Sequence, residues 1–350
     1  MNEVLKRVGL YDFLQSENGL QIKITDIENI KIGNAENEKA GTGCTVIICE
    51  NGAITGLDIR GGGPASRESE LTKPFASAEV IHAVLLSGGS AFGLDAAGGV
   101  MKYLEERNIG FDVGVTKVPL VCASCIFDLR VGDYKIRPNA KMSYKACINA
   151  EKNNPQMGNF GAGAGATVGK ILGLDYAMKS GLGFYALQIG NLKVGAIVSV
   201  NAFGDIFDYE SGKMIAGLLD IDKKGFRNSE EELIKIAEDK NLSFDIEKNN
   251  SITNTTIGAI ITNAKFTKSQ MGKIASMSHN GFARTIKPVH TTLDGDSIYA
   301  MSVGNVNANL DAVGSIAAIV MGKAINSAIV NTKSAYGFKA YNDLINFNAV

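Results

Sequence analysis

Short apolar runs rich in β-branched residues alternate along the chain with longer segments whose apolar residues recur at helical spacing. The short runs have the length of buried strands, and polar or glycine-rich turns bound them. Strands are expected at 81–86, 194–200 and 255–262. Helices are expected at 91–107, 233–240, 269–284 and 313–330. Because these elements follow one another without a regular strand–helix–strand rhythm, the pattern favours α+β layers over a doubly wound sheet.

Two tight turns predict β-hairpins. Asn51-Gly52 lies between the apolar stretches 44–49 and 54–59, and an Asn-Gly pair is a strong signal for a two-residue hairpin loop. The turn Leu293-Asp-Gly-Asp296 predicts a second hairpin. The chain shows no repeat and no low-complexity linker, so residues 1–350 are predicted to form one domain.

The junction at residue 255 is the most abrupt change of character in the chain. Residues 241–254 are largely polar, and Thr255-Thr-Ile-Gly-Ala-Ile-Ile-Thr262 then begins directly as an apolar, β-branched stretch. A solvated loop that enters a buried strand has this pattern. By itself the junction predicts a strand entry and nothing more.

Composition and charge exclude several classes of function. Hydrophobic residues make up 45% and charged residues 20% of the chain, as in ordinary globular proteins. The formal net charge of -1 provides no field that would favour nucleic acid or an anionic membrane, and it suits a small neutral substrate. The first ten residues lack the apolar core of a secretory signal, and the apolar runs fall short of the roughly 20 residues of a membrane span. These features predict a cytoplasmic protein without a nucleic-acid or membrane partner.

Glycine is the unusual component, with 40 residues of 350 against roughly 7% in average proteins. The clusters 61–63, 88–89 and 161–165 each lie between apolar segments, where the backbone must turn tightly or approach a neighbour closely. Two interpretations remain open. The clusters present backbone amides to a ligand, or they allow close packing of layered sheets and helices.

Two glycine clusters resemble nucleotide or nucleophile motifs without completing them. A phosphate loop over 161–170 would need glycine at 164 and a hydroxyl at 171, where the chain has Ala164 and Ile171. The segment 88–92 resembles a nucleophile elbow with Ser90 at its centre, but Phe92 replaces the second glycine. A tight helix entry capped by Ser90 is the preferred interpretation. A serine triad with one of the downstream histidines, His279 or His290, as its base is kept as a minor alternative.

The cysteines, histidines and acidic turns do not predict a metal site. Five cysteines are an odd number in a long chain, which favours reduced thiols. Cys122 and Cys125 lack the second pair or histidine cluster that tetrahedral zinc requires, so we interpret them as core residues. Asp294-Gly-Asp296 is too short for a calcium loop and is interpreted as a turn. No metal or cofactor is expected.

Seven segments together make the chain similar to the P1 peptidases, peptidase family S58, which include β-peptidyl aminopeptidases, D-aminopeptidases and nylon-oligomer hydrolases. They extend through nearly the whole chain and comprise 30–34, 41–45, 58–63, 86–95, 161–170, 254–257 and 288–291. The resemblance implies a four-layer αββα sandwich of the self-processing D-aminopeptidase/ornithine acetyltransferase type. It also implies an N-terminal-nucleophile hydrolase whose precursor cuts itself.

Thr255 occupies the nucleophile position of that family, so the resemblance implies cleavage of the bond Asn254-Thr255. The large chain, 1–254, and the small chain, 255–350, would stay associated because neither has a complete set of layers, and such pairs would assemble as homo-oligomers. A threonine hydroxyl needs a base to take its proton. The free α-amine of the same residue, with a reference pKa of roughly 7.7 to 8.0, is such a base.

Four further residues take roles from the resemblance. Lys170 matches the lysine of the nylon-hydrolase branch that tunes the nucleophile electrostatically, and Asn201 matches an asparagine that donates to the oxyanion. Asp294 and Asp296 match two acidic residues that orient the amine and hydroxyl of the nucleophile.

The implied function is an amidohydrolase or aminopeptidase that cleaves small peptides or amides through a Thr255 acyl-enzyme. Phe127 aligns with a tyrosine whose hydroxyl lies near the oxyanion in aminopeptidase-like members, so that donor is missing here. This departure leaves the substrate open, and threonine in place of serine favours the nylon-hydrolase branch. Two alternatives remain. One is an acyltransferase of the ornithine acetyltransferase type, whose usual Ala-Thr-Met-Leu junction is absent, and the other is a non-catalytic binding protein on the same fold.

Overall fold

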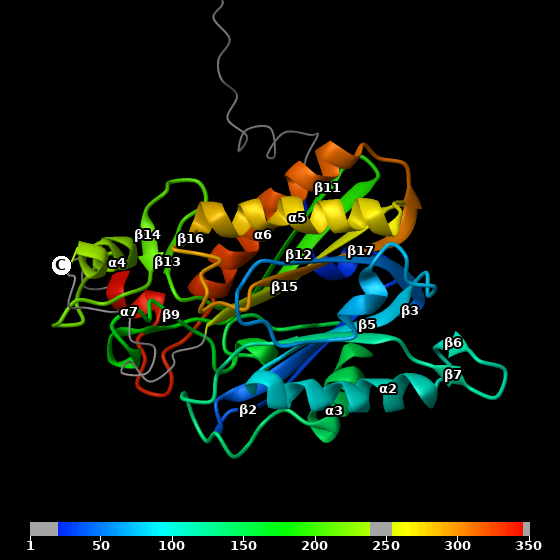
Figure 1. Cartoon of the computed structure of the whole chain (residues 1–350), viewed down its shortest axis with the longest axis horizontal. Helices are drawn as coiled ribbons and strands as arrows, with labels where there is room; N and C mark the ends of the chain where they lie inside the picture. Colours follow the sequence, from blue (N-terminus) through cyan, green and yellow to red (C-terminus); the bar gives the residue numbers. More distant parts are fainter. Residues whose placement is uncertain (1–19, 239–253, 346–350) are drawn as a thin grey trace, which may run out of the picture.

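The computed structural model describes residues 20–238 and 254–345. Four layers lie on one another (Figure 1). Helices α5 (Lys268–Thr285) and α6 (Leu310–Val330) cover a first sheet, and a second sheet lies beneath it. Helices α2 (Ala97–Glu105) and α3 (Ala140–Ala150) cover the second sheet from the far side. The predicted αββα sandwich is therefore confirmed.

The strands of the two sheets are joined through one long strand, β3 (Thr42–Ile59), which takes part in both. The second half of β3 closes the first sheet, whose other strands run in the order β1 (Leu20–Ile22), β11 (Leu182–Ile189), β12 (Leu192–Asn201), β15 (Thr255–Ala264) and β17 (Ser297–Val306). The first half pairs in the second sheet with β2 (Lys31–Asn37) and β5 (Ile81–Ser87), and β8 (Val121–Cys125) and β4 (Ser66–Arg67) follow.

Three apolar cores separate the four layers, and strand β15 shows how the sequence creates them. Successive side chains of a strand point to opposite faces. Ile257, Ala259 and Ile261 belong to the core between the two sheets, whereas Ile260 belongs to the core beneath α5 and α6. A third core joins the second sheet to α2 and α3. A continuously apolar strand such as β15 is therefore required at the centre of the molecule.

Shorter elements connect the layers. The remaining strands are β6 (Phe111–Asp112), β7 (Lys117–Val118), β9 (Thr167–Val168), β10 (Met178–Lys179), β13 (Asp205–Phe207), β14 (Met214–Ala216) and β16 (Ile286–Lys287). The remaining helices are α4 (Ser229–Glu238) and α7 (Tyr341–Ile345), with 3-10 turns η1 (Ile24–Asp26), η2 (Ser69–Thr72), η3 (Ser90–Ala96), η4 (Gly161–Gly163) and η5 (Leu174–Tyr176). The predicted strands and helices all appear, with shifted ends, and the first part of the predicted helix 91–107 is the 3-10 turn η3. The polar segment 241–253 lies outside the described residues.

Both predicted hairpins are wrong. Asn51-Gly52 lies within the continuous strand β3, where Gly52 has a φ of 78° and the pairing register shifts between Ile48 and Ala53. The two halves of β3 find partners elsewhere in the chain, so the Asn-Gly pair produces an irregularity rather than a reversal. The turn at Asp294 exists, but β16 before it pairs with β13, while β17 after it pairs with β3 and β15.

The helix entry after β5 differs in detail from its prediction. Gly89 occupies the capping position with a φ of 82°, and Ser90 is the first residue of η3 and makes no side-chain cap. Ser90 begins η3, which runs directly into α2. His279 lies on α5, in the opposite outer layer from α2 (Figure 1). The layer order therefore argues against a serine triad with His279, and the ring of the other candidate base, His290, contacts Asp296 instead. Cys122 and Cys125 are buried, as the core interpretation predicts.

Helix α6 has the length and apolarity of a membrane span. In the fold it packs against α5 and lies across β11 and β12, and 61% of its most apolar 18 residues are buried. Core helices pass the same test of length and composition. Gly183 of β11 permits this packing, because a Cβ there would come within 2.1 Å of the Ala324 carbonyl oxygen of α6. At this position, close packing explains the glycine.

Candidate active site

Thr255 is buried at the start of β15, in the middle of the first sheet. It lies directly opposite Asn201, the last residue of the antiparallel strand β12. Directly opposed residues in an antiparallel pair have Cα atoms about 4.5–5.5 Å apart. The sheet register therefore brings together two residues that are 54 positions apart in the sequence.

The carbonyl group between Asn254 and Thr255 is held on both sides. Its oxygen accepts a hydrogen bond from the Gly295 amide at 2.9 Å, and the Thr255 hydroxyl donates to the same oxygen. The Asn254 amide donates to the Leu293 carbonyl at 2.9 Å, so residue 254 forms a parallel bridge with Asp294. The hydroxyl thus lies against the carbonyl of the bond that the resemblance marks for cleavage, and a backbone donor polarises that carbonyl.

The turn that carries Asp294 and Asp296 surrounds this junction with hydrogen-bond acceptors. Asp296 accepts the Thr256 amide at 2.8 Å, which fixes the residue after Thr255. Asp294 accepts the Thr291 amide at 2.9 Å and the Thr291 hydroxyl at 2.6 Å, and its other oxygen accepts the Phe203 amide at 3.4 Å. Both carboxyl groups are buried. Each is therefore fixed in place by backbone donors.

The glycine cluster 61–63 holds the aspartate turn from outside. The Gly63 amide donates to the Asp294 carbonyl at 2.8 Å, and the Arg60 amide donates to the Asp296 carbonyl at 2.9 Å. A Cβ at Gly61 would lie 2.3 Å from the Asp294 carbonyl oxygen, so only glycine permits this approach. Gly295 is similarly required, because its Cβ would lie 2.8 Å from the Thr255 hydroxyl.

Lys170 and Asn201 form a buried polar pair beside Thr255. The Lys170 ammonium nitrogen donates to the Asn201 side-chain oxygen at 2.9 Å and to the Asn201 carbonyl at 3.0 Å. The same side-chain oxygen accepts the Thr167 amide at 3.1 Å. The Asn201 amide nitrogen donates to the Phe127 carbonyl at 3.0 Å. This donation uses one of two amide hydrogens, so a second can be offered to an oxyanion.

Burial changes the proton affinity of the charged groups. It lowers the pKa of Lys170 to about 7, because the buried ammonium loses its hydration, and Asp294 and Asp296 partly offset this by attraction. Burial, together with repulsion from Asp296, raises the pKa of Asp294. Perturbed amines and carboxyls of this kind cluster at catalytic sites, since they can exchange protons near neutral pH.

The structure thus brings together the five residues to which the resemblance assigns roles. Lys170 contacts Asn201, Asn201 lies opposite Thr255, and the aspartate turn holds Asn254 and Thr256 on either side of Thr255. Phe127 is half-buried and contributes its backbone carbonyl, with no hydroxyl to donate.

His290 is a site residue that the sequence analysis considered only as the base of a serine triad. Its ring nitrogen Nδ1 lies 2.9 Å from the Asp296 carboxylate, and its backbone amide donates to the same oxygen at 3.2 Å. The ring packs at 4.7 Å from that of His279 and 6.0 Å from that of Phe282. The segment 288–291 is one of the seven that carry the family resemblance, but only the fold shows that His290 contacts the Asp296 carboxylate.

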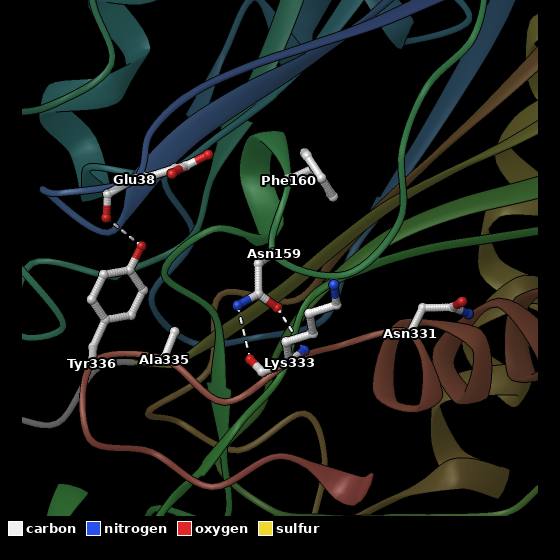
Figure 2. Close-up of a pocket in the computed structure, with 7 residues that line it drawn as sticks. All are labelled: Glu38, Asn159, Phe160, Asn331, Lys333, Ala335 and Tyr336. Atoms are coloured by element: carbon white, nitrogen blue, oxygen red, sulfur yellow. Dashed lines mark hydrogen bonds between the residues drawn. The ribbon is translucent and has the colours of Figure 1, made fainter.

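A pocket of about 340 Å³ lies apart from this arrangement (Figure 2). Asn159 and Phe160 line one side, and the segment 331–336 lines the other, with Tyr336 donating to the Glu38 carbonyl at 2.6 Å. Its charged side chains, Glu38 and Lys333, are exposed. Thr255, Lys170, Asp294 and Asp296 are not among the residues that line this pocket.

Comparisons with known proteins identify the family and the fold. The model of the family described as peptidase family S58 matches residues 23–342. An uncharacterised aminopeptidase of Mycobacterium leprae is 34% identical, over 91% of this chain and 92% of its own length. A 6-aminohexanoate-oligomer endohydrolase of Kocuria sp. is 29% identical, over 87% of this chain and 84% of its own length. The L-aminopeptidase D-Ala-esterase/amidase of Ochrobactrum anthropi, described as a variant of the Ntn hydrolase fold, superposes with a TM-score of 0.66 at 15% identity, covering 93% of each chain.

Proposed function

The chain belongs to peptidase family S58, and from this premise we propose that it is a self-processing hydrolase of small peptides or linear amides with Thr255 as its amino-terminal nucleophile. The single observation that supports this most strongly is the geometry at residue 254. The Thr255 hydroxyl contacts the carbonyl that it would attack, and the Gly295 amide donates to that carbonyl oxygen. Donors aimed at a carbonyl oxygen stabilise the negative charge that develops there during attack.

Self-cleavage requires a base other than an α-amine, because the nitrogen of Thr255 is still part of a peptide bond. Lys170, with a pKa of about 7, is a suitable base at neutral pH. A neutral amine has two N–H groups and one lone pair. Two N–H groups can donate to Asn201, as the observed hydrogen bonds do, which leaves the lone pair free to take up a proton.

The covalent steps then balance without a cofactor. The Thr255 oxygen forms a bond to the carbonyl carbon of Asn254, giving a five-membered ring, and the C–N bond breaks as the nitrogen takes up the proton. Water hydrolyses the resulting ester, which frees the Asn254 carboxylate and the Thr255 hydroxyl and leaves Thr255 with a free α-amine. In later turnovers this amine takes the hydroxyl proton, and the acyl group of the substrate forms an ester on Thr255.

The two products, 1–254 and 255–350, would remain one folded unit. Strands β15 and β17 of the small chain lie between β12 and β3 of the large chain in the same sheet. Helices α5 and α6 of the small chain cover that sheet. Separation would break both strand interfaces and expose the outer core, so we propose that the two chains stay together as a processed heterodimer. We also propose that these heterodimers assemble as homo-oligomers in the cytoplasm.

The substrate class follows from the site and from the relatives together. A buried nucleophile and a chain with a net charge of -1 suit a small neutral amide. The aminopeptidase and the 6-aminohexanoate-oligomer endohydrolase named above indicate two candidates, namely short peptides and linear amide oligomers.

Product analysis of both substrate types tests this function. Processed enzyme is incubated with alanyl peptides and with 6-aminohexanoate oligomers, each with and without an added amine acceptor such as ornithine. Hydrolysis products are expected in both conditions. Transfer to the acceptor without hydrolysis would instead identify an acyltransferase, and no turnover together with no covalent adduct would identify a binding protein.

His290 supplies a first prediction. His290→Ala should lower kcat about ten- to hundredfold, because a hydrogen bond to a charged group contributes about 1.5–3 kcal/mol. His290→Asn should retain most of the activity, since its amide can replace the Nδ1 donor and asparagine tolerates the left-handed backbone, here with a φ of 59°. The measurement is kcat and KM for both variants with their unfolding temperatures. Equal losses in the two variants would show that the ring packing, and not the hydrogen bond to Asp296, is what matters.

A further inference from the structure

Lys179 is a fully buried lysine whose ammonium is enclosed by backbone carbonyls of the glycine-rich turn. It donates to the carbonyls of Gly163 at 3.1 Å, Ala166 at 3.0 Å and Ser180. The turn thus directs carbonyl oxygens towards a cation, which is the opposite polarity to a phosphate loop, whose amides face an anion. The segment that resembles a phosphate loop in sequence therefore binds the chain's own lysine.

Two glycines of this turn are required because neighbouring backbone packs closely against them. A Cβ at Gly163 would lie 2.1 Å from the Leu182 amide nitrogen, and a Cβ at Gly165 would lie 2.1 Å from the Gly41 carbonyl oxygen. Strand β10 also pairs with β9, so that the backbone of Lys179 lies opposite Thr167. The side chain of Lys179 thus holds the turn, and its backbone holds β9, the strand that follows the turn.

That strand leads directly into the site. The Thr167 amide donates to the Asn201 side-chain oxygen at 3.1 Å, and Lys170, three residues later, donates to the same oxygen at 2.9 Å. Asn201 lies opposite Thr255. A displacement of the turn would therefore move both donors that fix Asn201, although Lys179 itself contacts neither Asn201 nor Thr255 in any hydrogen bond described above.

A buried carboxyl group balances the charge of Lys179. Asp128 is buried and accepts the Thr42 hydroxyl at 2.7 Å and the Gly89 amide at 2.7 Å. Its attraction partly offsets the effect of burial, which lowers the pKa of Lys179 to about 7. An ammonium that is costly to bury is thus retained with three acceptors and a compensating charge, and a well-packed apolar side chain would avoid that cost.

We propose that Lys179 is a positioning residue for the reaction, holding the turn 163–166 so that Thr167 and Lys170 keep Asn201 in place beside Thr255. The inference rests on the proposed function, since it assigns the residue to the Thr255 site. It explains why an ammonium, and not an apolar side chain, fills the interior of the turn.

Lys268 offers a matched control. It is also buried, and its ammonium donates to three backbone carbonyls, those of Leu71, Ala76 and Ala78. Lys268 follows the end of β15, whereas Thr255 begins it, so the control lies roughly 30 Å along the strand from the nucleophile at about 3.3 Å per residue. Lys179→Met and Lys268→Met therefore remove the same kind of interaction near to and far from the site.

The experiment compares both variants with wild type in unfolding temperature, self-cleavage half-time, kcat, KM and the pH dependence of self-cleavage. Both variants should unfold at lower temperature. Only Lys179→Met should slow self-cleavage and lower kcat, each about tenfold or more, with KM nearly unchanged and the pH midpoint set by Lys170 displaced. Slowing no greater than in Lys268→Met would overturn the proposal.

A second variant keeps the test decisive if Lys179→Met does not fold. Asp128→Asn preserves size and can still bond to Gly89 and Thr42, but it removes the compensating charge. It should slow self-cleavage several-fold, and a wild-type rate would contradict the proposal. Wild-type protein that never cleaves itself would instead refute the proposed function, so the two failures are distinguishable.

Discussion

Thr255→Ala is expected to leave the chain whole at 350 residues and to abolish amide hydrolysis. The substitution removes the hydroxyl that contacts the Asn254 carbonyl. Thr256 cannot replace it, because adjacent side chains of a strand point to opposite faces and the Thr256 amide is held by Asp296. Loss of a nucleophile in a hydrolase costs at least about a thousandfold in rate. Denaturing electrophoresis and an amide hydrolysis assay measure the two effects.

Two variants serve as controls for this result. Thr255→Ser keeps a hydroxyl in the same place and should still cleave itself and turn over substrate. Thr256→Ala removes the neighbouring buried hydroxyl and should cleave itself as wild type does. If Thr255→Ala separated into chains of 254 and 96 residues, another group would have to be the nucleophile, and the assignment of Thr255 would be wrong.

Lys170→Met is expected to slow self-cleavage by about 10²- to 10⁴-fold, the range that general base catalysis contributes. The pKa of Lys170 is lowered to about 7, so the lysine is cationic below that pH and increasingly neutral above it. If the neutral amine is the base, wild-type self-cleavage accelerates as pH rises through 7 and then levels off. The Met variant should lack this rise. Precursor from cell-free synthesis, transferred to buffers between pH 5.5 and 9, gives the rates.

Lys170→Arg distinguishes a base from a fixed charge. Arginine retains the positive charge and the hydrogen-bond donors but does not lose its proton in proteins. The variant should therefore be as slow as Lys170→Met in self-cleavage. Recovery of the wild-type rate by arginine would show that Lys170 acts through its charge alone.

Apolar patterns in the sequence predicted the central elements correctly, because these elements are buried in the fold. The apolar stretch at 255–262 becomes β15 and the long helical pattern at 313–330 becomes α6. The hairpins failed because local turn signals do not reveal the distant partners of a strand. Asn51-Gly52 lies in a strand whose two halves pair in different sheets, and the sequence around it carries no sign of that.

The candidate site residues were named from the resemblance of several segments together, but the contacts among those residues could not be predicted from the sequence. The register that places Asn201 opposite Thr255 depends on the pairing of β12 with β15, two strands separated in the sequence by residues 202–254. Lys179 carries no local signal either, since it simply follows a methionine in a short strand. Its role depends on the fold, which places the carbonyls of the glycine-rich turn around its ammonium. The role of His290 likewise depends on the turn that brings the Asp296 carboxylate into contact with its ring.

Intact-mass analysis of freshly purified wild-type protein tests the central claim most directly, because it requires no knowledge of the substrate. We expect two species, residues 1–254 and 255–350, with Thr255 at the amino terminus of the smaller one. A single species of 350 residues that hydrolyses amides would contradict the claim that Thr255 becomes the nucleophile by self-cleavage.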